Sequence, residues 1–238
     1  MAAEGDTDSY AAAESEEASG SPARLVALSD GVYAIALTLL VLNLSVPADL
    51  EHAGFAHALH DVWPRLGTYG LSFAVIASLW RDHRRIFQFV ARIDDAAIRL
   101  TLAGLGAVAL LPFPTTLLSD YGGHEPEAVT FYAATIAAAN LMYLLLFVRI
   151  LRHAGLRASP IPRRVARGMA TDHAGTILIA AATAAVAWTV SPAAGLYLWL
   201  AALPCGVAAR RMRRPSRARR PKRARRPKRA RRTGQKSG

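Results

Sequence analysis

Apolar residues in this chain fall into long blocks that are separated by short polar segments. Blocks of roughly 20 apolar residues are long enough to cross a membrane as helices, because a rise of about 1.5 Å per residue spans about 30 Å of hydrocarbon. The spans predicted in this way cover residues 24–46, 63–80, 96–118, 129–148, 171–190 and 193–209. The pattern therefore predicts an all-α integral membrane protein with six transmembrane helices.

Prolines mark several boundaries of these spans. Pro47 ends the first span, and Pro112 and Pro114 predict a kink or an early stop late in the third. The short acidic segment 120–127 contains two glycines and predicts a turn. Spans five and six are joined by Ser191-Pro192, which predicts a tight hairpin.

Charge is distributed unevenly along the chain and predicts its orientation. The loops after spans two and four are rich in arginine, whereas the loops after spans one, three and five hold acids or no charge. Arg65, near the start of span two, is the exception. The positive-inside rule places the arginine-rich loops in the cytoplasm, and six spans then place both termini there too. We expect a multi-pass protein of the cell membrane.

The two ends of the chain differ from the segment between them. Residues 1–23 are acidic and are expected to form a disordered arm, followed by a six-helix transmembrane domain over 24–209. Of the 29 Lys and Arg residues, 16 lie in residues 210–238, a segment without acids that repeats PSRARR, PKRARR, PKRARR. Prolines at this spacing prevent a continuous helix, so we expect a disordered basic tail.

Three roles for the basic tail stay open. It can act as a topology anchor and solubilising segment, or it can contact anionic lipid, which attracts Lys and Arg at about 1 kcal/mol per residue. It can also bind nucleic acid without sequence preference. No specific nucleic-acid partner is expected.

Motifs of catalysis are missing from the sequence. It has no Gly-rich phosphate loop, no G-x-S-x-G, no H-E-x-x-H and no paired carboxylates deep in one span. Cys205 is the only cysteine, so a cysteine-based zinc site is not possible. His52, His57 and His60 lie in the polar segment 48–61, which is predicted to be a loop, but no acid or cysteine completes a recognisable metal site. We expect no enzyme, no cofactor and no bound metal.

The first span carries a stripe of residues at helical spacing. Ile35, Thr38, Leu39 and Leu42 stand at i, i+3, i+4 and i+7 and share one face of a helix. If copies of this face met around an axis, they would form a narrow pore with a hydrophobic constriction that gates by dewetting. The alternative is an ordinary packing face, in which Thr38 bonds its own backbone.

Asp30 lies well inside the first span and needs a partner. An acid in such a span costs about 2.5–3.5 kcal/mol unless it is paired or hydrated. Arg24 and Ser29 are close in sequence, while Trp80 and His83 follow at the cytoplasmic end of span two. Antiparallel neighbours would bring these groups to the same depth. The sequence predicts a polar network of these five residues that fixes the first helix, with or without a part in conduction.

These residues carry a resemblance to a known family. Arg24, the Leu28-Ser29-Asp30 triplet and the following GVYAIALTLLVL closely resemble the first-helix signature of the transmembrane protein 175 family, the potassium channels of lysosomes and prokaryotes. The family's usual triplet is Phe-Ser-Asp, so Leu28 keeps an apolar side chain but loses an aromatic one. SLWRDHRRIF, from Ser78 to Phe87, resembles the end of the family's second helix. The resemblance covers the first third of the chain.

The resemblance implies a function and an assembly. It implies a passive potassium channel of four chains with six spans each, whose pore is lined by the first helix. It also implies Ile35 as the main hydrophobic constriction, with Thr38, Leu39 and Leu42 along the pore. The T-V-G-Y-G carbonyl filter is missing, so side chains such as Thr38 would have to select potassium. The alternatives are a secondary transporter, or a membrane scaffold without transport whose basic tail binds lipid.

Overall fold

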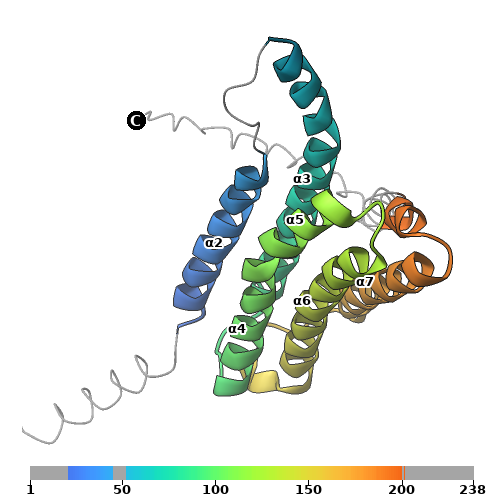
Figure 1. Cartoon of the computed structure of the whole chain (residues 1–238). Coiled ribbons are helices and arrows are strands. Elements are labelled where there is room, and N and C mark those ends of the chain that lie inside the picture. The colour runs from blue at the N-terminus through green and yellow to red at the C-terminus, as the bar shows by residue number, and fades with distance from the viewer. Residues whose placement is uncertain (1–20, 45–51, 200, 202–238) are drawn as a thin grey trace, which may run out of the picture.

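The computed structural model describes residues 21–44, 52–199 and 201, which are almost entirely helical (Figure 1). The helices are α2 (Pro22–Leu39), α3 (His52–Phe87), α4 (Asp95–Leu110), α5 (Pro112–Tyr121), α6 (Pro126–Arg152) and α7 (Arg163–Thr189), with the short 3-10 helices η1 (Leu40–Asn43) and η2 (Ala154–Leu156). Residues 192–199 are also helical. The acidic arm and the basic tail lie outside the described residues, apart from residues 21–23.

Four segments of the described chain are long and apolar enough to cross a membrane. They are Pro22–Leu42, Asp95–Tyr121, Pro126–Arg152 and Arg163–Thr189. They coincide with the first, third, fourth and fifth predicted spans. The second predicted span lies within α3, which is not one of the four, and most of the sixth lies outside the described residues.

Two boundaries near the first span differ from the predicted ones. The regular α-helix ends at Leu39 and continues as the tighter turn η1, where Leu44 N donates to Val41 O at 3.0 Å. Such turns satisfy carbonyls that lack a partner at the end of an α-helix. The prediction of a loop over 48–61 was wrong from His52 onward, because this alanine-containing stretch forms the first turns of α3.

Prolines also stand at two later helix boundaries, between α4 and α5 and before α7. The predicted break late in the third span is confirmed, since α4 ends at Leu110 and Pro112 begins α5. The fifth span was predicted to begin at Thr171, but α7 begins directly after Pro162. The arginines at 163, 164 and 167 therefore lie on the first turns of a helix and not in a loop.

Helix α6 lies at the centre of the bundle and packs against α4, α5 and α7. Its approach to α4 depends on Gly104, where an added Cβ would stand 2.5 Å from Cε1 of Tyr143. Small residues allow membrane helices to pack this closely. The core also contains a polar layer, in which Thr115 Oγ1 lies 2.8 Å from Ser72 Oγ and Ser72 Oγ lies 3.1 Å from the Tyr132 hydroxyl. This layer joins α3, α5 and α6.

The connections after α3 and after α6, where the sequence predicted arginine-rich loops, are joined to each other at one end of the bundle. Each connection itself holds one arginine, Arg92 or Arg157, because most of the predicted loop arginines lie on the adjoining helices. Ala91 N donates to Leu156 O and Ala158 N donates to Phe89 O, both at 2.9 Å. The segment after α3 and the segment after α6 are thereby paired like short strands, so the ends of the helices that they connect are held together.

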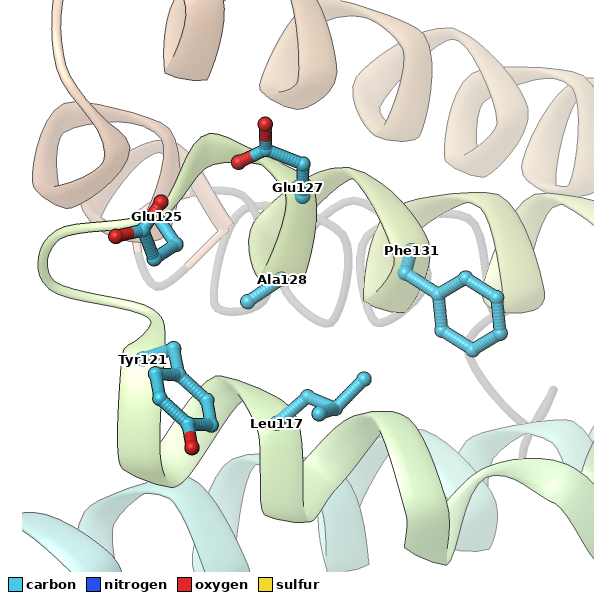
Figure 2. A pocket seen from close by; sticks show the side chains of 6 residues that line it. All are labelled: Leu117, Tyr121, Glu125, Glu127, Ala128 and Phe131. Carbon is cyan, nitrogen blue, oxygen red and sulfur yellow. The ribbon is translucent and has the colours of Figure 1, made fainter.

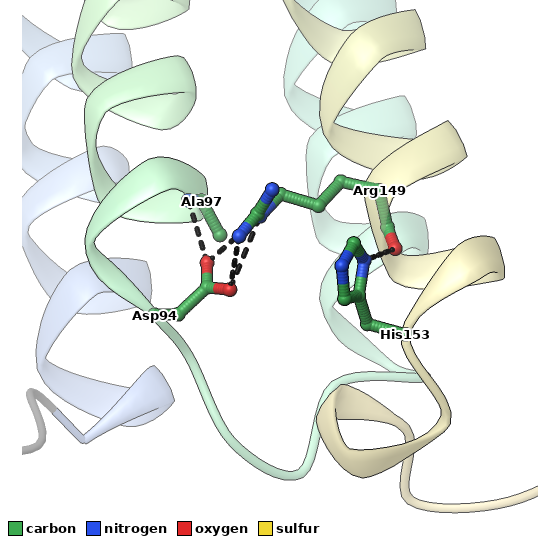
Figure 3. A network of polar contacts seen from close by, with 4 residues as sticks. All are labelled: Asp94, Ala97, Arg149 and His153. Carbon is green, nitrogen blue, oxygen red and sulfur yellow. Dashed lines mark hydrogen bonds and ion pairs between the residues drawn. The ribbon is translucent and has the colours of Figure 1, made fainter.

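An ion pair reinforces this junction (Figure 3). Asp94 caps α4 by accepting from Ala97 N at 2.9 Å, and it pairs with Arg149 of α6 through contacts of 3.0 Å (Nε–Oδ1) and 2.6 Å (Nη2–Oδ2). The Arg149 hydrogen bonds hold the pKa of the Asp94 carboxyl below its usual range. The beginning of α4 and the end of α6 are thus fixed to each other.

Candidate functional site

Helix α2 has one packed face and one open face. Ser29, Tyr33 and Ala36 are buried against the rest of the chain. On the other side, Ile35 of α2 is 60% exposed, and Leu42, in the turn η1 that follows, is 71% exposed. Large apolar side chains exposed in this way, on a helix long enough to span a membrane, need either lipid or another protein surface to cover them.

All four predicted pore-lining residues lie on the open side of the first span. Ile35, Thr38 and Leu39 are exposed on α2, while Leu42 lies in the 3-10 turn η1 that follows it. The Thr38 hydroxyl donates to Ile35 O at 2.9 Å. The lone pairs of its oxygen therefore remain available on the open face. None of these side chains is buried within the described part of the chain.

The packed side of α2 is anchored to α3 through Asp30. Trp80 Nε1 donates to Asp30 Oδ1 at 2.8 Å, and Arg84 Nη1 lies 3.2 Å from Asp30 Oδ2. The two carboxylate oxygens thus receive separate donors from successive turns of α3. This arrangement supplies the partner that an acid within an apolar span requires.

Ser29 forms a second contact between the same helices. Its hydroxyl donates to Leu25 O at 2.7 Å, and its oxygen lies 3.3 Å from His83 Nε2. Because the serine hydrogen is already used, His83 Nε2–H must be the donor in the second contact. The His83 ring is fully buried, with ring centroids of Phe87 and Tyr143 at 4.5 and 5.5 Å.

The structure brings together Ser29, Asp30, Trp80 and His83, but it leaves Arg24 apart. The guanidinium of Arg24 is exposed and makes no ion pair within the described residues. Arg84, which the sequence interpretation did not consider, takes the place next to Asp30. It follows Trp80 by four positions and therefore shares its face of the helix, a spacing that the sequence already contained.

Tyr33 is a further residue of the packed face that the sequence interpretation missed. Its hydroxyl lies 2.6 Å from the hydroxyl of Tyr143 on α6, and both side chains are buried. Tyr33 follows Ser29 by four positions, so both lie on one side of α2. The first helix is therefore bound through polar groups to α3 and to the central helix.

The side chains of His52, His57 and His60 lie outside what the structure describes, although their backbone belongs to α3. Among the described residues, no group of three His, Cys, Asp or Glu side chains stands close enough to hold a metal ion.

Fold and site together define a multi-pass helical membrane protein whose first helix is anchored on one side and open on the other. Residues 24–112 match the family model described as endosomal/lysosomal potassium channel TMEM175. The resemblance to the transmembrane protein 175 family is thus confirmed for this part of the chain.

Two curated relatives and one solved structure extend this comparison. The chain is 39% identical over 134 residues to a potassium channel of Streptomyces collinus, and 40% identical over 133 residues to a potassium channel of Chamaesiphon minutus. These matches cover 54% and 55% of the chain and 64% of each relative, which is less than two thirds of the relatives' length.

The crystal structure of a lysosomal potassium-selective channel TMEM175 homolog from Chamaesiphon minutus is similar to this fold. The TM-score is 0.66 at 27% identity, covering 79% of this chain and 97% of the other. The similarity therefore extends well beyond the segment that the family model matches.

Proposed function

We propose that this chain is one subunit of a homotetrameric, potassium-selective cation channel that conducts passively. The observation that carries the proposal is the open face of the first span, where Ile35 and Thr38 of α2 and Leu42 of η1 have no cover within the described chain while the opposite face is anchored. One copy of α2 cannot enclose a pore. Closed rotational symmetry is the usual way for copies of one face to meet, and relatives of this chain are named potassium channels.

We further propose six spans, with α3 as the second span and residues 193–209 as the sixth. Trp63 and Trp80 lie on α3, 17 positions apart, or about 26 Å along a helix. Tryptophans are enriched at both surfaces of a membrane. Arg65, the exception to the charge rule, lies 3.7 Å from Asp120 of α5, so its charge is paired at that end of the bundle. Both termini then lie in the cytoplasm, on the same side as the arginines in the last turns of α3 and α6.

In the tetramer, ions would pass along the open face of four α2 helices. Rings of Ile35 and Leu42 side chains would form narrow apolar constrictions, which exclude water unless the helices splay or rotate. Thr38 lies between them, and its oxygen lone pairs would replace part of the hydration shell of the potassium ion. The anchoring of Asp30 to Trp80 and Arg84 would hold each helix at a fixed rotation about its own axis.

Ion flux into liposomes that contain the purified full-length protein tests this function. We expect a potassium flux that follows the membrane potential and exceeds the sodium flux. Ile35→Asn would hydrate the constriction and raise the sodium flux relative to potassium, and Thr38→Ala would lower the preference for potassium. Leu178→Asn is the matched control, because Leu178 is 69% exposed on α7, away from α2.

Three outcomes would contradict the proposal. Flux that requires a second, coupled ion would indicate a secondary transporter, and the lack of any flux would indicate a scaffold. An equal effect of Leu178→Asn and Ile35→Asn on selectivity would show that the open face of α2 does not line the pore.

A further inference from the structure

A cavity of about 300 Å³ lies between the beginning of α2 and the beginning of α4. Four of its six lining side chains are apolar, and the remaining two belong to a serine and an arginine. The lining residues are Ser21, Arg24, Leu25, Leu28, Ile93 and Ile98. The lining residues place the cavity where α2 and α4 begin. The connections after α3 and after α6 lie at this same end of the bundle (Figure 1), which is the cytoplasmic surface in the proposed orientation.

Arg24 is the charged group of this cavity, and the described chain does not neutralise it. Asp30, its expected partner, is bound by Trp80 and Arg84. Asp94, which directly follows the cavity residue Ile93, is occupied by Arg149. The first turn of α2 contains no acid. An anion from outside the described chain would therefore find an available guanidinium there.

We propose that this cavity binds a phospholipid with an anionic head group, such as phosphatidylglycerol. The lipid phosphate would accept hydrogen bonds from the Arg24 guanidinium, whose planar fork matches phosphate geometry. The upper part of one acyl chain would lie against Leu25, Leu28 and Ile98. Anionic lipids are concentrated in the cytoplasmic leaflet, where this end of the bundle would lie. A free phosphate compound would leave the apolar wall unfilled, so the lining favours a lipid.

A second cavity of about 370 Å³, at the opposite end of the bundle, is lined by acidic instead of basic side chains (Figure 2). It lies between α5 and α6, and its interior is formed by apolar and aromatic side chains including Leu117 and Phe131. Its charged residues are Glu125 and Glu127, and Figure 2 shows the Glu127 carboxylate directed away from α5. Two carboxylates at its edge would repel a phosphate. The charge near the two cavities therefore assigns the anionic lipid to the α2–α4 cavity.

Occupancy of the α2–α4 cavity would affect the first helix directly. Leu25 and Leu28 belong to α2 and immediately precede the anchor formed by Ser29 and Asp30. A lipid between α2 and α4 would therefore stabilise the beginning of α2 against α4. The membrane position of this cavity rests on the proposed orientation, but lipid binding does not require ion conduction and is measured separately.

Native mass spectrometry of the full-length protein in detergent tests the proposal, with phosphatidylglycerol as the probe and phosphatidylcholine as the zwitterionic comparison. Arg24→Gln removes the charge from the cavity, whereas Arg99→Gln removes an exposed charge of α4 that does not line it. The basic tail is the same in both variants. We expect Arg24→Gln to weaken the tightest phosphatidylglycerol binding about tenfold, as for a lost charge-assisted hydrogen bond, and Arg99→Gln to leave it unchanged.

A second variant tests the apolar half of the site without changing charge. Ile98→Trp would fill the cavity and should also abolish the tight binding. Soluble glycerol 3-phosphate should not compete with the lipid, because it has no acyl chain. Equal lipid binding by Arg24→Gln and Arg99→Gln, or full competition by glycerol 3-phosphate, would overturn the proposal. A change in oligomer mass with Ile98→Trp would show that a second copy of the chain fills the cavity.

Discussion

The hydroxyl of Tyr33 on α2 lies 2.6 Å from the hydroxyl of Tyr143 on α6, and both rings are buried. One hydroxyl donates and the other accepts, so each satisfies the other away from water. This contact connects the packed face of the first helix to the central helix. In the proposed channel, the rotation of the pore helix is thus coupled to the core of its own subunit.

The tyrosine pair predicts strongly non-additive effects of removing its hydroxyls. Tyr143→Phe should lower stability by about 1–3 kcal/mol, because it leaves the Tyr33 hydroxyl buried without a partner. The double variant Tyr33→Phe/Tyr143→Phe should be closer to the parent than either single variant. Thermal unfolding of the detergent-solubilised protein measures these effects as a double-mutant cycle. Additive losses would mean that the two hydroxyls do not interact.

Replacing Gly104 of α4 by alanine tests how closely α4 and α6 pack, and replacing Gly106 on the same helix is the control. Gly104→Ala places a methyl group 2.5 Å from the Tyr143 ring, which Tyr33 and His83 hold in place, so we expect a loss of about 1–3 kcal/mol. Gly106→Ala meets nothing within 4 Å and should be neutral or slightly stabilising. At this chain length, each kcal/mol shifts the apparent Tm by about 2–4 °C. Equal Tm values for the two variants would refute the close approach of α4 and α6.

Trp80→Phe tests the anchor of the first helix. The change removes the indole N–H that Asp30 accepts at 2.8 Å and leaves Arg84 as its remaining partner. We expect a loss of about 1 kcal/mol in stability, because the site is partly exposed, together with an altered ion flux. Trp63→Phe is the control on the same helix, since Trp63 is 69% exposed and makes no hydrogen bond in the described chain.

Asp30→Asn removes the negative charge of the contact between α2 and α3 but keeps a side chain of nearly the same shape. Asparagine can still accept from Trp80, but it loses the ion pair with Arg84. We expect altered assembly or flux in liposomes, and little change for Asp120→Asn, which removes the longer ion pair with Arg65. If Asp30→Asn assembles and conducts like the parent, the network of Asp30 has no role in either property.

The Asp94–Arg149 pair predicts a dependence of stability on pH. Its carboxyl pKa is held below the ordinary value by Arg149, so the folded chain binds a proton there less readily than the unfolded chain. This contribution is present above the ordinary carboxyl pKa of about 3.9 and is lost as the pH falls through the lower folded value. The parent Tm should therefore fall more steeply below about pH 4 than that of Asp94→Asn, which keeps the helix cap.

Asp95→Asn provides the control for this measurement, because Asp95 is the exposed neighbour of Asp94 at the beginning of α4. Its acid dependence should match that of the parent. An identical slope for all three proteins would show that the ion pair does not contribute to stability at acidic pH.

The sequence by itself determined the helical class, the apolar spans and the composition of most of the anchor. The length of an apolar segment determines whether it can cross a membrane. An acid inside such a segment, such as Asp30, is costly unless it is paired, so the sequence also predicts that Asp30 accepts from a donor. Helical spacing also placed Ile35, Thr38 and Leu39 on one face, because that periodicity is local. Prolines such as Pro112 set a boundary for the same reason.

Only the tertiary structure decided which face of α2 packs against the other helices and which residues contact that face. Arg84 binds Asp30 and Arg24 does not, because the choice depends on how α2 and α3 are rotated and aligned in depth. The contact between Tyr33 and Tyr143 joins residues 110 positions apart, so no local sequence pattern predicts it. Long-range packing sets these relations, whereas the apolar pattern sets only the helices between which they form.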